Sequence, residues 1–210
     1  MGLAYGVFGT DLSFSNDMEA TIQRRAVSAS FEYRLSERWN LVAGAGTSFL
    51  GRLEMAGERH TLNPGWLGSI SGSYRMWDGK GTLPFFGLLT MTVAVSGAST
   101  SKERSAPLMP QSAAPSGTGE TDASFFAADA RLGLIVGKTF WNVLTPYAGV
   151  RVFGGPIFWR FQGKDIQGTD QYHYQLALGF SSSLPVGIDL FAEAVPLGER
   201  AVSVGGGLAF

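Results

Sequence analysis

The chain of 210 residues contains no cysteine and only two histidines. Without cysteine there can be no disulfide framework, no thiolate metal site and no thiol nucleophile. Charged residues make up 16% of the chain, below the share of about 25% in an average soluble domain. The 16 basic and 17 acidic residues leave a net charge of −1, which excludes a protein that holds nucleic acid by neutralising many phosphates.

Long apolar runs are also missing. The most apolar stretch, residues 83–98, is too short for a transmembrane helix, which needs about 20 apolar residues. No secretory signal is visible at the N-terminus, so we expect a mature domain from which the targeting segment has been removed. The length predicts a single domain over residues 1–210.

Alternation of apolar and polar residues with a period of two runs through most of the chain. Between Val27 and Leu35 every odd-numbered residue is apolar, and every even-numbered residue is Ser, Glu or Arg. Such alternation is typical of β-strands with one apolar face. We predict ten strands, at residues 2–15, 20–36, 39–52, 65–77, 83–98, 124–138, 144–162, 170–184, 187–196 and 200–210.

The connectors between these strands differ in length. Short connectors follow the second, fourth, sixth and eighth strands, whereas residues 52–63 and 99–122 form long polar loops. This sorting of turns is typical of a transmembrane barrel with short periplasmic turns and longer extracellular loops. We therefore predict an all-β, antiparallel up-and-down barrel of ten strands, or of eight if two segments are fused or lost. The Gly-Gly-Pro run at 154–156 is expected to form a bulge that shifts the inward and outward register.

The two faces of these strands predict which side meets lipid. The polar face carries arginines, each of which would cost several kcal/mol if it were buried unpaired in a soluble core. We therefore expect the apolar face to contact lipid and the polar face to line the lumen. Aromatic residues gather at two heights, as expected at the two membrane interfaces. The tryptophans predicted there are Trp39, Trp66, Trp77, Trp141 and Trp159.

The last ten residues, AVSVGGGLAF, alternate and end in Phe210. They resemble the closing strand of bacterial outer-membrane β-barrels, in which this pattern is the signal read by the barrel-insertion machinery. The resemblance implies a location in the bacterial outer membrane. It also implies the lipid bilayer, lipopolysaccharide and the insertion machinery as partners. The chain is similar in architecture to small OmpA-like and OmpW-like barrels, although ten strands would exceed their eight and no motif identifies either group.

Charged residues on the inward face are the candidate functional residues. The predicted mid-lumen cluster consists of Glu32, Asp129, Arg131, Arg151 and Glu193, and the predicted rim consists of Arg34, Arg75 and Asp189. These groups would form either a constriction that selects small solutes or a salt-bridged plug, since buried charges must be paired. The first interpretation predicts a narrow channel or passive transporter. The second predicts a plugged barrel that acts through its loops in adhesion, recognition or an envelope complex.

A third hypothesis is an outer-membrane hydrolase or acyltransferase. The histidines are His60, in a long loop, and His173, on an inward face. Neither is flanked by a catalytic motif, and the sequence shows no pairing of either histidine with a serine nucleophile. The sequence therefore predicts no catalytic residue, no metal site and no cofactor.

Overall fold

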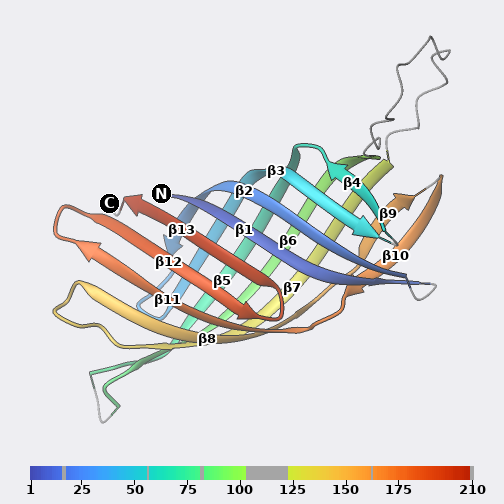
Figure 1. Cartoon of the computed structure of the whole chain (residues 1–210). Coiled ribbons are helices and arrows are strands. Elements are labelled where there is room, and N and C mark those ends of the chain that lie inside the picture. The colour runs from blue at the N-terminus through green and yellow to red at the C-terminus, as the bar shows by residue number, and fades with distance from the viewer. Residues whose placement is uncertain (16–17, 56, 81–82, 103–122, 162, 209–210) are drawn as a thin grey trace.

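The computed structural model describes residues 1–15, 18–55, 57–80, 83–102, 123–161 and 163–208, and these contain thirteen strands in one antiparallel sheet (Figure 1). The strands are β1 (Gly2–Phe14), β2 (Met18–Arg34), β3 (Trp39–Met55), β4 (Glu58–Leu62), β5 (Gly65–Asp78), β6 (Phe86–Lys102), β7 (Ala123–Gly137), β8 (Leu144–Gly154), β9 (Ile157–Phe161), β10 (Lys164–Asp170), β11 (Tyr174–Leu184), β12 (Ile188–Leu197) and β13 (Arg200–Leu208). Within these residues no helix has the length and apolar character needed to span a membrane.

Ten of the strands close a ring at the end of the molecule that carries the short turns and both termini. The pairing runs β1-β2-β3-β5-β6-β7-β8-β11-β12-β13, and β13 pairs with β1 over eight positions from Gly2↔Gly207 to Gly9↔Arg200. The Met1 amino group donates a hydrogen bond of 3.0 Å to the Leu208 carbonyl, which ties the terminal strands together. A closed ring leaves no unpaired strand edge, as a bilayer requires.

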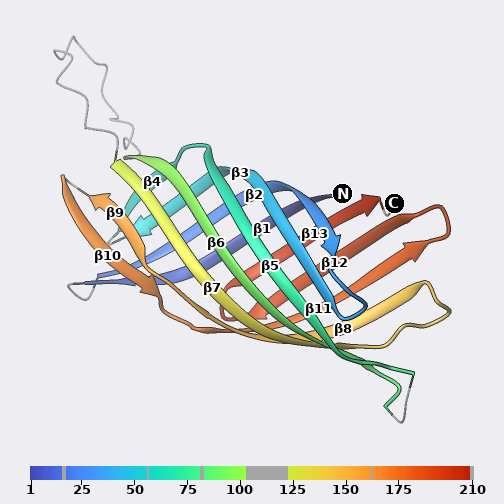
Figure 2. The ribbon, with the colours of Figure 1, turned by 180° about the vertical axis from the view of Figure 1, so that it is seen from behind.

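A second, smaller ring closes at the opposite end. There β4 replaces β5 between β3 and β6, and the β9–β10 hairpin joins β7 to β1. The four strands β8, β11, β12 and β13 do not reach this level, so the wall consists of β1, β2, β3, β4, β6, β7, β9 and β10. Figures 1 and 2 show β4, β9 and β10 gathered at the end farthest from the termini. We call the two parts the lower ring and the upper ring.

The upper ring corrects three sequence-based predictions. Residues expected to be connectors form β4 and β10, and the predicted strand 144–162 is divided into β8 and β9. Strand β6 extends to Lys102, and the rest of the predicted loop, residues 103–122, lies outside the described residues.

The predicted register shift at Gly-Gly-Pro does not occur. Gly154 lies opposite Ala130, and Ile157 lies opposite Ala127, so both strands contain the same number of residues in this interval. Because no residue is extra, Phe153 and Ile157 remain on the same inward, buried face. The proline ends β8 without inserting a bulge.

Strand β2 inverts its polarity along its length. In the lower ring its outward residues are apolar and exposed, as Val27 (40% exposed) and Phe31 (57%) show. In the upper ring the outward positions are Thr21 and Gln23, whereas the inward Ile22 is buried. The lower half therefore has an apolar outside, and the upper half has the polar outside and apolar inside of a water-soluble barrel.

Strand β3 achieves the same inversion through a bulge. Its pairing with β2 shifts by one residue beside Leu50, which has a positive φ of 49° and is 70% exposed. Before the bulge the even-numbered residue Ser48 is buried, and after it the odd-numbered Leu53 and Met55 are buried. The extra residue thus directs the apolar side chains of upper β3 into the ring.

These inward side chains form the main apolar core, inside the upper ring. Leu12, Leu53 and Trp159 are 0–1% exposed and are its most deeply buried members. The cluster consists of Leu12, Phe14, Ala20, Ile22, Leu53, Met55, Leu62, Phe125, Ile157, Trp159 and Ile166. The prediction of Trp159 at a membrane interface is therefore wrong. Its indole Nε1 donates to Thr100 Oγ1 at 3.0 Å inside the ring, because alternation continues unshifted through Gly-Gly-Pro.

Candidate functional site

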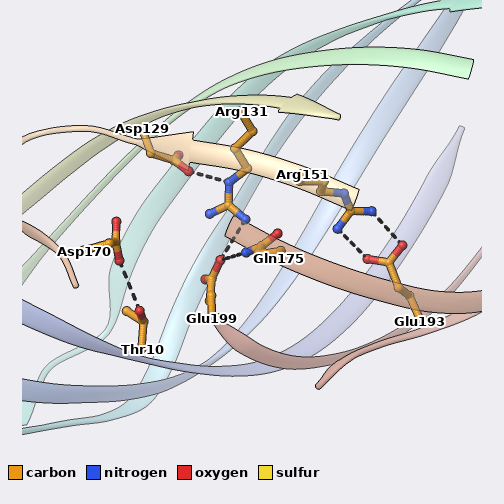
Figure 3. A network of polar contacts seen from close by, with 8 residues as sticks. All are labelled: Thr10, Asp129, Arg131, Arg151, Asp170, Gln175, Glu193 and Glu199. Atoms are coloured by element: carbon orange, nitrogen blue, oxygen red, sulfur yellow. Dashed lines mark hydrogen bonds and ion pairs between the residues drawn. The ribbon is translucent and has the colours of Figure 1, made fainter. Parts of the chain in front are cut away.

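A layer of charged side chains crosses the interior where the two rings meet (Figure 3). Arg131 on β7 pairs with Asp129 on the same strand and, at 2.8 Å, with Glu199 in the turn between β12 and β13. Glu199 also accepts a hydrogen bond from the Gln175 amide on β11. The guanidinium of Arg131 therefore lies between two carboxylates, one of which is itself held by a third strand.

A second ion pair lies beside the first. Arg151 on β8 donates from both Nη atoms to the Glu193 carboxylate on β12, at 2.8 and 2.7 Å. The Tyr147 hydroxyl donates to the same carboxylate at 3.1 Å. Bidentate geometry of this kind fixes both side chains and joins strands that are not direct neighbours. The layer therefore connects four strands and one turn through side-chain contacts inside the barrel.

The structure brings together four of the five residues of the predicted mid-lumen cluster, and Glu32 is the exception. Glu32 lies on β2 opposite Val42, is exposed, and joins no ion pair among the described residues. Counting residues from the short turn between their strands also predicts that Arg131 and Arg151 lie at the same height. In the structure Arg151 instead lies opposite Gly133 of β7, and Arg131 lies opposite Phe153 of β8. Tilt and stagger of the strands explain both errors, because residues counted from a turn do not measure height in a closed ring.

The predicted rim and interface residues occupy the outer parts of the molecule. Arg34, Arg75 and Asp189 are all exposed toward the short-turn end. Trp39, Trp66 and Trp141 are 50, 53 and 84% exposed, and Trp77 is partly buried over Gly87. Phe210, the predicted insertion signal, lies outside the described residues.

Sequence reasoning missed Glu199, Gln175 and Arg24. Glu199 falls between the ninth and tenth predicted strands, where the sequence names no candidate residue, yet it is 8% exposed. On β1, Gly9 pairs with Arg200 of β13, and further along the same strand Leu12 pairs with Asp170 of β10. Strand β10 therefore lies directly beyond the β12–β13 turn and covers it. Only this non-local arrangement makes a turn residue part of the interior.

Arg24 lies on the inward face of β2 at the level of the charged layer. Its Nη1 donates to Ser96 Oγ at 3.0 Å, and its guanidinium lies 4.5 Å from the centre of the Phe8 ring. It lines a cavity of about 280 Å³ between the charged layer and the apolar core. A second space of about 430 Å³ lies on the lower side of Arg131 and Arg151, with hydroxyl groups of β5 and β6 in its wall.

The histidines lie in the wall of the molecule. His60 is buried on β4, with its ring edge-on to Trp159 at 5.2 Å and its Nε2 3.8 Å from the Glu58 carboxylate. His173 Nδ1 lies 3.2 Å from the Phe153 carbonyl oxygen. In the part of the chain that the structure describes, no group of three or more His, Asp or Glu residues could hold a metal ion.

Comparison with solved structures identifies the type of fold. The outer-membrane protease OmpT from Escherichia coli matches 98% of this chain and 93% of its own, with a TM-score of 0.54 and 8% identity. The chain has the fold of an outer-membrane β-barrel. This fold is that of proteins of the bacterial outer membrane, and the exposed apolar face of the lower ring fits that location.

Weaker likenesses are to autotransporter barrels. The translocator domain of NalP from Neisseria meningitidis gives a TM-score of 0.49 at 12% identity, covering 100% of this barrel and 89% of that chain. The β domain of the Bordetella autotransporter BrkA gives 0.47 at 15% identity, covering 100% and 99%. No protein-family model and no curated protein matches the sequence. The expected similarity to OmpA-like and OmpW-like barrels gains no support from these comparisons.

Proposed function

We propose that this protein is an integral outer-membrane barrel of ten transmembrane strands, closed to solutes, that acts through its upper ring in recognition or adhesion. The observation that carries the proposal is the apolar core that fills the upper ring. A solute crossing the barrel would have to pass through side chains such as Leu53 and Trp159, which leave no accessible surface for water.

The charged layer forms a second closure below the core. Its ion pairs use the guanidinium groups of Arg131 and Arg151, so neither of these two is free to attract a solute ion. The sequence predicted a channel first and a plugged barrel second. Two successive closures, one apolar and one ionic, favour the plugged barrel.

The outer surface of the upper ring is suited to water and to a partner molecule. Strands β2, β3 and β6 each contain 17 residues, whereas a tilted strand crosses a bilayer with about 9–11. At the lower edge of the upper ring, where β9 begins, Trp66, Phe126 and Phe158 form an exposed aromatic group with ring separations of 6.3 and 6.4 Å. Aromatic side chains favour the membrane interface, so this group marks the level at which the wall leaves the lipid.

The test combines conductance with labelling, which the lack of cysteine makes simple. We expect the wild-type barrel to show no steady conductance in planar bilayers. In liposomes, a membrane-impermeant maleimide should label Arg52→Cys quickly and Leu53→Cys hardly at all, because adjacent residues face opposite sides of β3. Steady conductance, together with rapid labelling of Leu53→Cys, would instead establish a water-filled channel.

A further inference from the structure

The interior cavity between the charged layer and the apolar core combines two kinds of wall. Leu12, Ile22 and Phe125 contribute apolar surface from the side of the core. Arg24 and Asp170 contribute opposite charges. With about 280 Å³ of space, the cavity is larger than a few water molecules need.

Two buried polar atoms in this wall have no hydrogen-bond partner among the residues that the structure describes. They are Arg24 Nε and Gln175 Oε1, and the Gln175 side chain as a whole is only 3% exposed. Buried donors and acceptors are nearly always satisfied, because leaving one unpaired costs about 1–3 kcal/mol. One donor and one acceptor in the same cavity therefore indicate that something polar belongs between them.

The charges of the cavity wall lead to the same conclusion. Its three arginines and four acidic residues are Arg24, Arg131, Arg151, Asp129, Asp170, Glu193 and Glu199. Arg131 and Arg151 pair with three of the acids. Among the described residues, Arg24 and Asp170 join no ion pair, and Asp170 accepts a single side-chain hydrogen bond, from Thr10 at 3.2 Å.

We propose that this cavity binds a small zwitterionic molecule with an apolar part, of the class of an aliphatic α-amino acid. Its carboxylate would accept from Arg24, and its ammonium group would donate to Asp170 and to Gln175 Oε1. Its side chain would pack against Leu12 and Ile22. A simple anion would leave Asp170 unpaired, and a simple cation would leave Arg24 unpaired, so a ligand with both charges matches the wall best.

The lower lumen offers a route to this site. The cavity and the 430 Å³ space below it share Ala94, Arg131 and Arg151 in their walls. Side chains of the charged layer are therefore the barrier between them, and a shift of these side chains would admit a ligand from the short-turn side. The site goes beyond the proposed function, since it requires neither conductance nor a partner at the upper ring.

In the experiment, L-leucine is titrated into the folded barrel in detergent micelles at neutral pH, and isothermal titration calorimetry measures its dissociation constant. The matched analogues are 4-methylpentanoate, which lacks the amine, and 3-methylbutylamine, which lacks the carboxylate. We expect L-leucine to bind at least about tenfold more tightly than either analogue, because each loses a charged hydrogen-bond partner. These ligand comparisons use the wild-type protein and so do not depend on any variant folding.

Variants then locate the site. Arg24→Gln and Asp170→Asn should each weaken L-leucine binding at least about tenfold, whereas Arg75→Gln, at the exposed rim, should leave it unchanged. Gel mobility of unheated samples reports whether each variant is folded. Absence of L-leucine binding to the wild-type barrel would show that the cavity holds water only. Unchanged binding by folded Arg24→Gln would equally overturn the proposal.

Discussion

At the scale of single residues, the Arg151–Glu193 pair shows how the interior is held. Both side chains are largely buried, at 19% and 14% exposure. Removing one member leaves the other charge without its partner, which typically costs about 3–5 kcal/mol in a dry site. We therefore predict that Glu193→Ala lowers the free energy of unfolding by about 3 kcal/mol, measured by urea titration of the barrel in lipid vesicles.

A matched control lies on the same strand. Asp189 also follows the inward alternation of β12 but is exposed at the short-turn end, so Asp189→Ala should change stability little. Equal, small effects of the two substitutions would mean that water reaches Arg151. That result would support a hydrated pore instead of a plugged barrel.

Residue-scale prediction from sequence succeeded where alternation alone decides direction. Asp129, Arg131, Arg151 and Glu193 lie on the inward face because each follows the period of two along a regular strand. The same rule would have placed Trp159 inside, had no shift been assumed at Gly-Gly-Pro. Glu199 could not be found this way, since its burial depends on β10, a segment distant in sequence.

At the scale of strands, β3 contains a bulge that the sequence does not predict. Bulges are usually sought at glycine, as they were here at Gly154, whereas the one in β3 uses Leu50 with a positive φ. A left-handed conformation costs a non-glycine residue about 1–2 kcal/mol, and Leu50 is too exposed to regain much by packing. We predict that Leu50→Gly leaves the free energy of unfolding unchanged or raises it by up to about 1 kcal/mol.

The same substitution elsewhere on β3 provides the comparison. Leu41 is also outward and 39% exposed, but it lies in the regular, apolar part of the strand. Leu41→Gly should therefore destabilise the barrel by about 1 kcal/mol or more, through lost apolar contact and weaker strand propensity. Equal losses for both variants in urea titrations would contradict the strained bulge at Leu50.

At the scale of the whole molecule, the sequence indicated a closed antiparallel barrel but not its two-level construction. Alternation alone predicts one inward and one outward face, of constant polarity, for every strand. Strand β2 exchanges these faces between Ile22 and Val27, so an apolar inward residue near the long loops could not be told from a lipid-facing one. In the proposed function the lower ring meets lipid and the upper ring meets water, which places the charged layer where the two environments change.

Closure of both rings predicts how the protein behaves in detergent. Every strand of the lower ring is paired on both sides, including β1 with β13 at the junction of the termini. Separating such a ring requires many hydrogen bonds to break together, so it should persist in SDS at room temperature and open only on boiling. We predict a heat-dependent shift of the band in gel electrophoresis and a circular dichroism spectrum dominated by β-structure. A helix-rich spectrum, or full solubility without detergent, would contradict a membrane-embedded lower ring, because its outward face presents side chains such as Phe31 and Leu132 to the surroundings.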